Sequence, residues 1–439
     1  GVLVFNGVTG SVKVRSLTDT VNGRANLNLA FASSTTGASI NANFDVTGHA
    51  ADLRFDVMQL AQRISTSASP ATATFAFDTG TLDANDLLLG YKAATAANAT
   101  GTMTLGGTGV STFNSVANTM RIGVNAGTSA TASGTLNVTG GTVTVAGNAG
   151  TAIKLGDASA AGGTAAGTLN LTGGTLTVTG DILRGATTGT STAVLNLDGG
   201  TLDLSGNDLG GNGSNTNNLT TLTLASSTLK NVGQINNGAG LTKTTAGTLT
   251  LAGASSYTGV TTVSAGKLAV TNFGDGLTAS ALGLAGLAPA NLVLATGTTL
   301  GYVGAGETSA RGFTVNDGAT LDASGAGAIA ISSAAKVAFA NSTATRSLTL
   351  DGTSTGANSF GAGLSVGGTL DADKINLIVK NGVGTWIIAN GETLKSTAEI
   401  DVNVGILGLA AGVLSATGRV VLANGSTLRF ESGNTDDLS

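Results

Sequence analysis

Gly134-Thr-Leu-Asn-Val-Thr-Gly-Gly141 occurs three times in this chain of 439 residues, with its later copies at Gly167-Thr-Leu-Asn-Leu-Thr-Gly-Gly174 and Ala193-Val-Leu-Asn-Leu-Asp-Gly-Gly200. A recurring phrase of this kind is typical of repeat architectures, in which each unit buries its apolar face by stacking on the next unit. The phrase alternates apolar and polar residues, which is the period of a β-strand. These repeats therefore predict a β-solenoid.

A glycine also marks a fixed place upstream of each phrase. The spacing is 33 residues from Gly90 to Gly123 and again to Gly156, and 29 residues from there to Gly185. One such repeat is long enough for a coil of three short strands and a projecting loop, such as residues 157–166. Because every coil runs in the same direction, we expect the strands to pair in parallel.

The alternation within one repeat assigns side chains to the interior or to the surface, since neighbouring residues of a strand point to opposite faces. The residues predicted to point inward are Leu136, Val138, Val143 and Val145, and those predicted to point outward are Asn137, Thr139, Thr142 and Thr144. Gly140–Gly141 falls at a corner, where a positive φ is expected. The Asn shared by the three copies predicts a ladder of stacked amides at Asn137, Asn170 and Asn196.

The composition fits a stack of similar coils and narrows the function. Charged residues make up only 10% of the chain, because like charges in adjacent coils would repel each other across about 4.8 Å. The net charge of −5 provides no basic stripe for nucleic acid, and no apolar run approaches the roughly 18 residues of a membrane span. The chain begins at Gly1 without Met or a signal peptide, so we expect a processed or trimmed form.

Three regions are predicted along the chain. Residues 1–75 contain the only His, His49, and are interpreted as a strand-rich cap or docking region with one short helix. The alternative is a set of irregular first coils of the same solenoid. The helix is predicted from an apolar face with a period of 3.6 residues at Leu53, Val57, Leu60, Ala61 and Ile64. Residues 76–237 are predicted to form a solenoid of 33-residue-type repeats, and residues 238–439 a second solenoid region.

The repeated phrase changes from about Gly238, and the new phrase resembles the autotransporter-associated β-strand repeat. The positions that match this pattern are Leu241, Lys243, Gly247, Leu249, Leu251, Gly253, Tyr257, Gly259, Thr261, Val263, Gly266 and Leu268. Thr245 and Ser255 stand where Gly and Asn are usual. A degenerate second copy places its matches at Lys380, Gly384, Trp386, Ile388, Ile400, Gly405 and Leu407. The resemblance implies a right-handed parallel β-helix in the exported passenger of a secreted or surface-displayed protein.

Right-handed β-helices also include polysaccharide lyases and hydrolases, and an enzyme of this kind would need paired carboxylates on neighbouring coils. Paired carboxylates occur at Asp198 with Asp203, Asp371 with Asp373, and Asp436 with Asp437. Asp198 and Asp203 replace Thr positions of earlier repeats, where they either solubilise the surface or bind a cation or sugar. With one His and no Cys, we name no catalytic, cofactor-binding or metal-ligating residue and expect neither an enzyme nor a cofactor.

Three further patterns have competing interpretations. Outward Thr pairs at 142/144 and 175/177 suggest an ice-binding array, but Thr201 and Asp203 interrupt it, and strand propensity explains Thr as well. Residues 210–215 resemble one nonapeptide of a calcium-binding β-roll, although no tandem copy follows, which favours a tight loop. Trp386 and Tyr257 occupy repeat positions and are interpreted as core or corner packing rather than sugar platforms.

We interpret the chain as a structural β-solenoid protein of the cell surface or extracellular space. The strand-like segment Val420–Phe430 carries no cap, which leads to the hypothesis of a fibre subunit that polymerises head to tail through its N- and C-terminal ends. The first alternative is an adhesin passenger that binds glycans or neighbouring cells, and the second is a polysaccharide lyase or hydrolase. Cell-surface glycans are the expected outside partner, and we expect no nucleic acid and no membrane-spanning segment.

Overall fold

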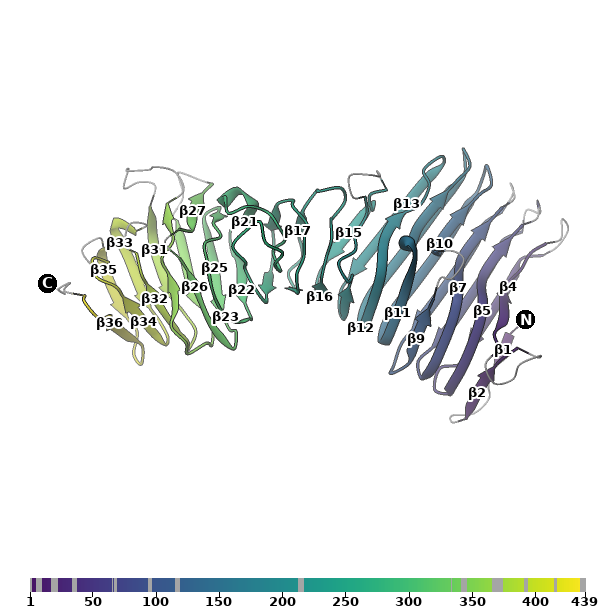
Figure 1. The fold of residues 1–439 in the computed structure, drawn as a ribbon, viewed down its shortest axis with the longest axis horizontal. Coiled ribbons are helices and arrows are strands. Elements are labelled where there is room, and N and C mark those ends of the chain that lie inside the picture. The colour runs from purple at the N-terminus through teal and green to yellow at the C-terminus, as the bar shows by residue number, and fades with distance from the viewer. Residues whose placement is uncertain are drawn as a thin grey trace. The chain divides into compact units, whose positions relative to one another are not determined.

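The computed structural model divides the chain into two compact units, Gly1–Gly238 and Ala239–Ser439 (Figure 1). The structure describes residues 2–4, 10–16, 23–33, 38–64, 66, 69–93, 97–114, 119–211, 217–332, 334–340, 346–364, 374–390, 394–413 and 417–434. Each unit is a β-solenoid whose strands pair in parallel with the strands of the next coil. The prediction of an all-β parallel solenoid is therefore confirmed.

Strands at the same position of successive coils form a ladder, and unit 1 has three ladders. The first ladder contains β1 (Val2–Val4), β4 (Ile40–Asp45), β6 (Ala71–Phe77), β8 (Ala99–Leu105), the beginnings of β11 (Thr131–Ala158) and β12 (Thr164–Arg184), β13 (Thr190–Leu197) and β15 (Thr221–Leu224). This ladder passes residue 75 without interruption, so residues 40–77 form coils of the same solenoid. A capping or docking role for residues 1–75 stays a prediction.

The other two ladders of unit 1 use the later parts of each coil. The second contains β2 (Ser11–Val14), the beginnings of β5 (Ala50–Arg63) and β7 (Gly80–Lys92), β9 (Val110–Phe113), the middles of β11 and β12, β14 (Thr201–Asp203) and β16 (Ser227–Lys230). The third contains β3 (Ala25–Leu29), the ends of β5 and β7, β10 (Met120–Asn125) and the ends of β11 and β12.

The helix predicted over Leu53–Ile64 is wrong, because these residues lie in or directly after strand β5. The apolar period resembled that of a helix because Leu60 and Ala61 are both buried and interrupt the strand alternation. Ala61 has a φ of 58° at this bend. It aligns with Gly90 of the next coil, since the neighbouring pair is Leu60 with Leu89. Ala61 is therefore the counterpart of the periodic glycine.

The interior of unit 1 is made of apolar ladders, as predicted. Leu136 pairs in register with Leu169, and Leu169 pairs with Leu195. All three side chains are fully buried, and so is the parallel row of Val138, Leu171 and Leu197. Val143 and Val145 also point inward, while Thr142 is exposed and Thr144 is half-buried. At the predicted corner, Gly141 has a φ of 68°.

Unit 2 also has three ladders. The first contains β18 (Thr248–Ala252), β20 (Lys267–Val270), β22 (Thr298–Tyr302), β25 (Gly318–Ala323), β28 (Ser347–Asp351), β31 (Ile375–Lys380), β33 (Leu394–Val402) and β35 (Thr417–Leu422). The second contains β17 (Leu241–Lys243), β19 (Thr261–Val263), β21 (Leu292–Leu294), β24 (Phe313–Val315), β27 (Lys336–Phe339) and β30 (Gly363–Leu364).

The third ladder of unit 2 contains β23 (Ala305–Ser309), β26 (Gly327–Ile331), β29 (Asn358–Phe360), β32 (Thr385–Ile388), β34 (Ile406–Leu409) and β36 (Thr427–Phe430). A short 3₁₀-helix, η1 (Pro289–Asn291), precedes β21. Across the described ranges, no helix is long and apolar enough to cross a membrane.

Candidate interaction surface

The outward side of the second ladder of unit 1 carries a row of mostly polar side chains, which we call the polar face and which exposed Val110 interrupts between Thr81 and Thr142. Its members are Asp52, Arg54, Asp56, Thr81, Asp83, Asn85, Thr112, Asn114, Thr142, Thr144, Thr175, Thr177, Thr201, Asp203, Thr228 and Lys230. The residues between them point inward, such as Leu53 and Phe55, which are 0% and 1% exposed. The strand period thus places polar groups of successive coils above one another.

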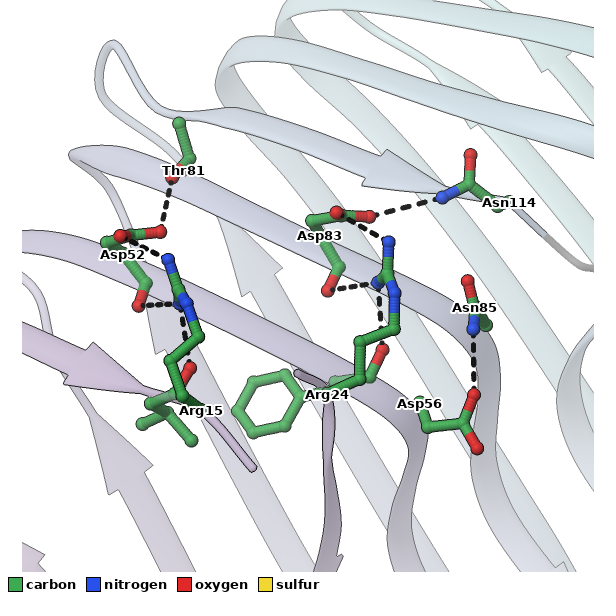
Figure 2. Close-up of polar contacts among 10 residues, drawn as sticks. Arg15, Arg24, Asp52, Asp56, Thr81, Asp83, Asn85 and Asn114 are labelled. Atoms are coloured by element: carbon green, nitrogen blue, oxygen red, sulfur yellow. Dashed lines mark hydrogen bonds and ion pairs between the residues drawn. The ribbon is translucent and has the colours of Figure 1, made fainter. Parts of the chain in front are cut away.

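Arg15, which directly follows β2, binds Asp52 on β5 and so joins the preceding coil to the first coil of the polar face. Its guanidinium forms an ion pair with the carboxylate of Asp52 and donates from Nη1 to the Asp52 carbonyl at 2.8 Å (Figure 2). The Thr81 hydroxyl donates to the other carboxylate oxygen at 3.2 Å. The hydrogen bond from Arg15 lowers the pKa of Asp52, because it stabilises the charged carboxylate.

Arg24 repeats this arrangement one coil further along. Its Nη2 lies 2.6 Å from Asp83 Oδ2, and its Nη1 donates to the carbonyls of Phe55 and Asp83, each at 3.1 Å (Figure 2). Asn114 Nδ2 donates to Asp83 Oδ1 at 3.1 Å. The Arg24 guanidinium therefore joins the coils that contain Phe55 and Asp83, and the Asp83 carboxylate connects them to the coil that contains Asn114.

The carboxylates at this end of the polar face are all engaged by neighbouring donors. The third, Asp56, accepts a hydrogen bond from Asn85 Nδ2 at 2.7 Å (Figure 2). Among the residues that the structure describes, no group of three or more His, Cys, Asp or Glu side chains is arranged to hold a metal ion. The arrangement offers hydrogen-bonding groups held in fixed positions.

Threonine occupies the middle of the polar face. Thr142 pairs with Thr175, which pairs with Thr201, and Thr201 pairs with Thr228. The neighbouring row runs from Thr144 through Thr177 and ends at Asp203, as predicted from the sequence. The Thr pairs therefore stack over successive coils, but only one of the two rows continues as Thr.

Asp203, one of the carboxylates singled out in the sequence, is committed to neighbouring donors. It lies 3.2 Å from Lys230 Nζ and accepts hydrogen bonds from Asn231 Nδ2 at 2.9 Å and Ser205 N at 3.0 Å. Burial raises its pKa, but these donors outweigh burial and hold the pKa below its usual range. Asp198 is exposed and directly precedes Gly199–Gly200. No described contact joins the carboxylates of Asp198 and Asp203.

The predicted Asn ladder is confirmed on the first ladder of unit 1. Asn196 Nδ2 donates to Asn170 Oδ1 at 2.9 Å, and Asn170 Nδ2 donates to Asn137 Oδ1 at 2.8 Å. Asn137 Nδ2 continues the chain to Thr104 Oγ1 at 3.4 Å. The stacked amides satisfy one another, which explains why the same residue recurs in each phrase.

The two aromatic residues singled out in the repeat of unit 2 pack in the core, as predicted. Trp386 is 1% exposed and donates from Nε1 to the Asp351 carbonyl at 2.7 Å. Tyr257 is fully buried, its hydroxyl lies 3.0 Å from Thr261 Oγ1, and burial raises its pKa to about 12. Neither ring is available as a sugar platform.

Several sequence-based candidates lie outside the described residues. Both members of the pairs Asp371 with Asp373 and Asp436 with Asp437 fall there, and so does most of segment 210–215. Conversely, the roles of Arg15 and Arg24 were not predicted from the sequence. The available signal was the spacing of 31 residues between Asp52 and Asp83, which is close to one repeat.

Comparison with known proteins identifies the repeat of unit 2. Residues 241–270 match the family described as passenger-associated-transport-repeat. The chain carries an autotransporter passenger repeat. It is also 32% identical over 164 residues to the Adhesin BmaC autotransporter of Brucella suis biovar 1 (strain 1330). That alignment covers 37% of this chain and 5% of the adhesin. No solved structure matches the chain.

The passenger repeat and the adhesin relative confirm the resemblance drawn from Leu241–Leu268. They indicate a passenger-type protein located at the cell surface or outside the cell. The chain spans only a small part of its relative's length, so the match describes a segment of such a passenger.

Proposed function

We propose that this β-solenoid is an adhesive segment of its passenger and that its outward polar faces contact glycans or neighbouring cells. The observation that carries the proposal is the 32% identity over 164 residues to an autotransporter adhesin. The polar face supports it, because carboxylates, amides, hydroxyls and guanidinium groups hydrogen-bond to sugar hydroxyls. Their fixed positions lower the entropy cost of binding.

We further propose that the chain acts by binding and not by catalysis. A glycoside hydrolase needs two carboxyl groups with separate acid and base or nucleophile roles. The carboxylates described on the polar face instead accept hydrogen bonds from Arg15, Arg24, Asn85 and other neighbours. A polysaccharide lyase or hydrolase is the competing function.

A glycan array and a reducing-sugar assay on one preparation separate these functions. We expect glycan binding without release of reducing ends. The double variant Asp56→Ala/Asn85→Ala should weaken binding, because it removes an outward pair from the polar face. Thr102→Val is the matched control, since Thr102 points outward from the first ladder instead. Release of reducing sugar, or equal binding by both variants and the unmodified chain, would contradict the proposal.

A second proposal is self-association through coil edges. Leu422 and Phe430 are 52% and 38% exposed, whereas their partners Val402 and Leu409 in the preceding coil are buried. A further coil would cover them, supplied either by a longer chain or by the N-terminal end of a second copy. Electron microscopy of the chain with and without residues 1–10 tests this. Filaments that require residues 1–10 support it, and a monomer at high concentration contradicts it.

A further inference from the structure

Unit 2 contains a polar pocket at its first ladder, where the residues just before β22 lie beside β25 and β28. The pocket has a volume of about 320 Å³, and its polar side chains come from Thr296, Asp317, Thr320, Ser347 and Thr349. Gly318 pairs with Ser347, and Thr320 pairs with Thr349, so two adjacent coils present their hydroxyls in register. The volume lies at the lower end of the range for small-molecule sites.

The carboxylate of Asp317 lacks hydrogen bonds that a ligand can supply. Its Oδ2 accepts one long hydrogen bond, from Thr296 Oγ1 at 3.2 Å. Its Oδ1 is shielded from solvent and has no hydrogen-bond partner among the described residues. A shielded acceptor without a donor is costly, and native structures seldom keep one. Rotation about the Cβ–Cγ bond, a soft torsion for Asp, can turn this oxygen toward a donor in the pocket.

The glycine beside Asp317 keeps the pocket open. A Cβ atom on Gly318 would lie 2.3 Å from the hydroxyl oxygen of Ser347. The missing side chain therefore leaves room for the Ser347 hydroxyl at the pocket wall. Together with Thr320 and Thr349, it forms a set of groups that both donate and accept hydrogen bonds.

The chemistry of the lining selects the class of ligand. Among the described residues, no Lys, Arg or aromatic side chain lines this pocket, which disfavours an anion or a flat apolar ligand. A single carboxylate is a weak basis for a calcium site, which takes six to eight oxygen ligands and usually several carboxylates. A ligand rich in hydroxyl groups fits, because each hydroxyl can donate to Asp317 and exchange hydrogen bonds with Thr or Ser.

We propose that this pocket binds a neutral saccharide unit, with Asp317 accepting a hydrogen bond from a sugar hydroxyl. Thr320, Ser347 and Thr349 surround the same sugar with hydroxyls. The inference rests on the proposed adhesive function and locates one glycan site within unit 2, apart from the polar face of unit 1.

The test is an NMR titration of the full chain carrying ¹³C-labelled threonine methyl groups. The probes are glucose, galactose, mannose and N-acetylglucosamine, each alone, with calcium chloride as a separate probe. At least one sugar should shift the methyl signals of Thr320 and Thr349 and leave that of the buried Thr261 unchanged. Asp317→Asn should weaken this binding about tenfold or more, because a hydrogen bond to a charged acceptor is lost.

Asp322→Asn is the matched control, since Asp322 lies on β25, the strand that follows Asp317, outside this pocket, and pairs with Lys267 at 2.5 Å. Its sugar affinity should stay within about twofold of the unmodified chain, because it removes no group that lines the pocket. Thr349→Val provides a second variant, which should also weaken sugar binding. Circular dichroism confirms that each variant is folded before titration.

Three results would overturn the pocket assignment. The first is that none of the four sugars shifts the methyl signals of Thr320 and Thr349. The second is that Asp317→Asn and the unmodified chain bind sugar with equal affinity. The third is that calcium chloride shifts these methyl signals and no sugar does. Glycan-array binding that persists in Asp317→Asn would overturn this site but leave the adhesive function standing. Sugar binding at the pocket without any array or cell binding would support the site and contradict the adhesive function.

Discussion

Gly123 and Gly134 pack backbone against backbone where the third and first ladders of unit 1 approach each other. A Cβ atom on Gly134 would lie 2.4 Å from the Gly123 nitrogen, and a Cβ on Gly123 would lie 2.0 Å from the Ala166 carbonyl oxygen. Gly123 also has a φ of 72°. Gly90 and Gly156 meet both requirements as well, with φ values of 65° and 63° and backbone atoms close to an added Cβ, which explains the 33-residue spacing of glycine.

Replacing Gly123 by Ala should therefore destabilise unit 1 strongly. We expect a loss of more than about 3 kcal/mol in the free energy of unfolding, because overpacking and a left-handed backbone combine. Urea unfolding followed by circular dichroism measures it. The matched control is Gly286→Ala, where the nearest described atom, Asn291 Nδ2, is 3.5 Å away. Equal losses in the two variants would refute the close-packing argument.

Ala61 provides the reverse experiment. It occupies the place of the periodic glycine with a φ of 58°, a conformation that costs an L-residue about 1–2 kcal/mol. Ala61→Gly should therefore leave stability unchanged or raise it by up to about 1 kcal/mol, after the entropy cost of glycine. A clear loss of stability would mean that the methyl group contributes more through packing than it costs through strain.

The free energy of unfolding should respond very differently to substitutions at an inward and an outward position of the same repeat. Leu169→Ala should cost about 2–5 kcal/mol, because it leaves a cavity between Leu136 and Leu195. Thr175→Ser, on the polar face, should change stability by less than about 0.5 kcal/mol. Thermal and urea unfolding of both variants check this. Similar effects at the two positions would mean that the inward and outward faces are misassigned.

A double-mutant cycle tests the ion pair between Arg24 and Asp83. The two side chains are 25% and 29% exposed, so solvent screens the pair only in part, and we expect a coupling free energy of about 1 kcal/mol. The variants are Arg24→Met, Asp83→Asn and the double substitution. Additive effects would show that the pair does not join the coils energetically.

Lys380 predicts a dependence of stability on pH in unit 2. Its ammonium group is buried and donates to the carbonyls of Asn381, Gly382 and Val404 at 2.6, 2.7 and 3.1 Å. Burial lowers its pKa from 10.5 to about 8. Between these two values the unfolded chain binds more protons than the folded chain, so this group makes stability rise with pH.

The matched control is Lys380→Met, which keeps the length of the side chain and removes the titration. Relative to this variant, the unmodified chain should gain stability from about pH 8 to pH 10 and show no relative change between pH 6 and 7. Urea unfolding at each pH measures the difference. A relative stability that falls over the upper range would contradict the lowered pKa of Lys380.

The sequence predicted the interior of unit 1 well because its physical signal is local. Leu136, Asn137 and Val138 differ in polarity over adjacent positions, and each repeats one coil later. The helix failed at Ala61 because a bend with positive φ places two neighbouring side chains inside, which a period of two does not anticipate.

The polar contacts were harder to predict because they join residues from different coils. Arg15 lies 37 positions from Asp52, and Arg24 lies 59 positions from Asp83. These two ion pairs depend on the path of the chain through the first coils. The repeat pattern does not predict this path. The pocket at Asp317 likewise joins residues of different coils, since Thr296 precedes β22, Asp317 precedes β25 and Ser347 begins β28.

Adhesion of beads coated with the intact chain to animal or bacterial cells tests the central claim most directly. The comparison is between untreated cells and cells whose surface glycans have been oxidised with periodate, which cleaves vicinal diols. An adhesive passenger that recognises glycans predicts that coated beads bind untreated cells above albumin-coated beads and lose this binding after oxidation. Coated beads that bind neither cell sample more than albumin-coated beads would contradict adhesion, and binding unaffected by periodate would contradict glycan recognition.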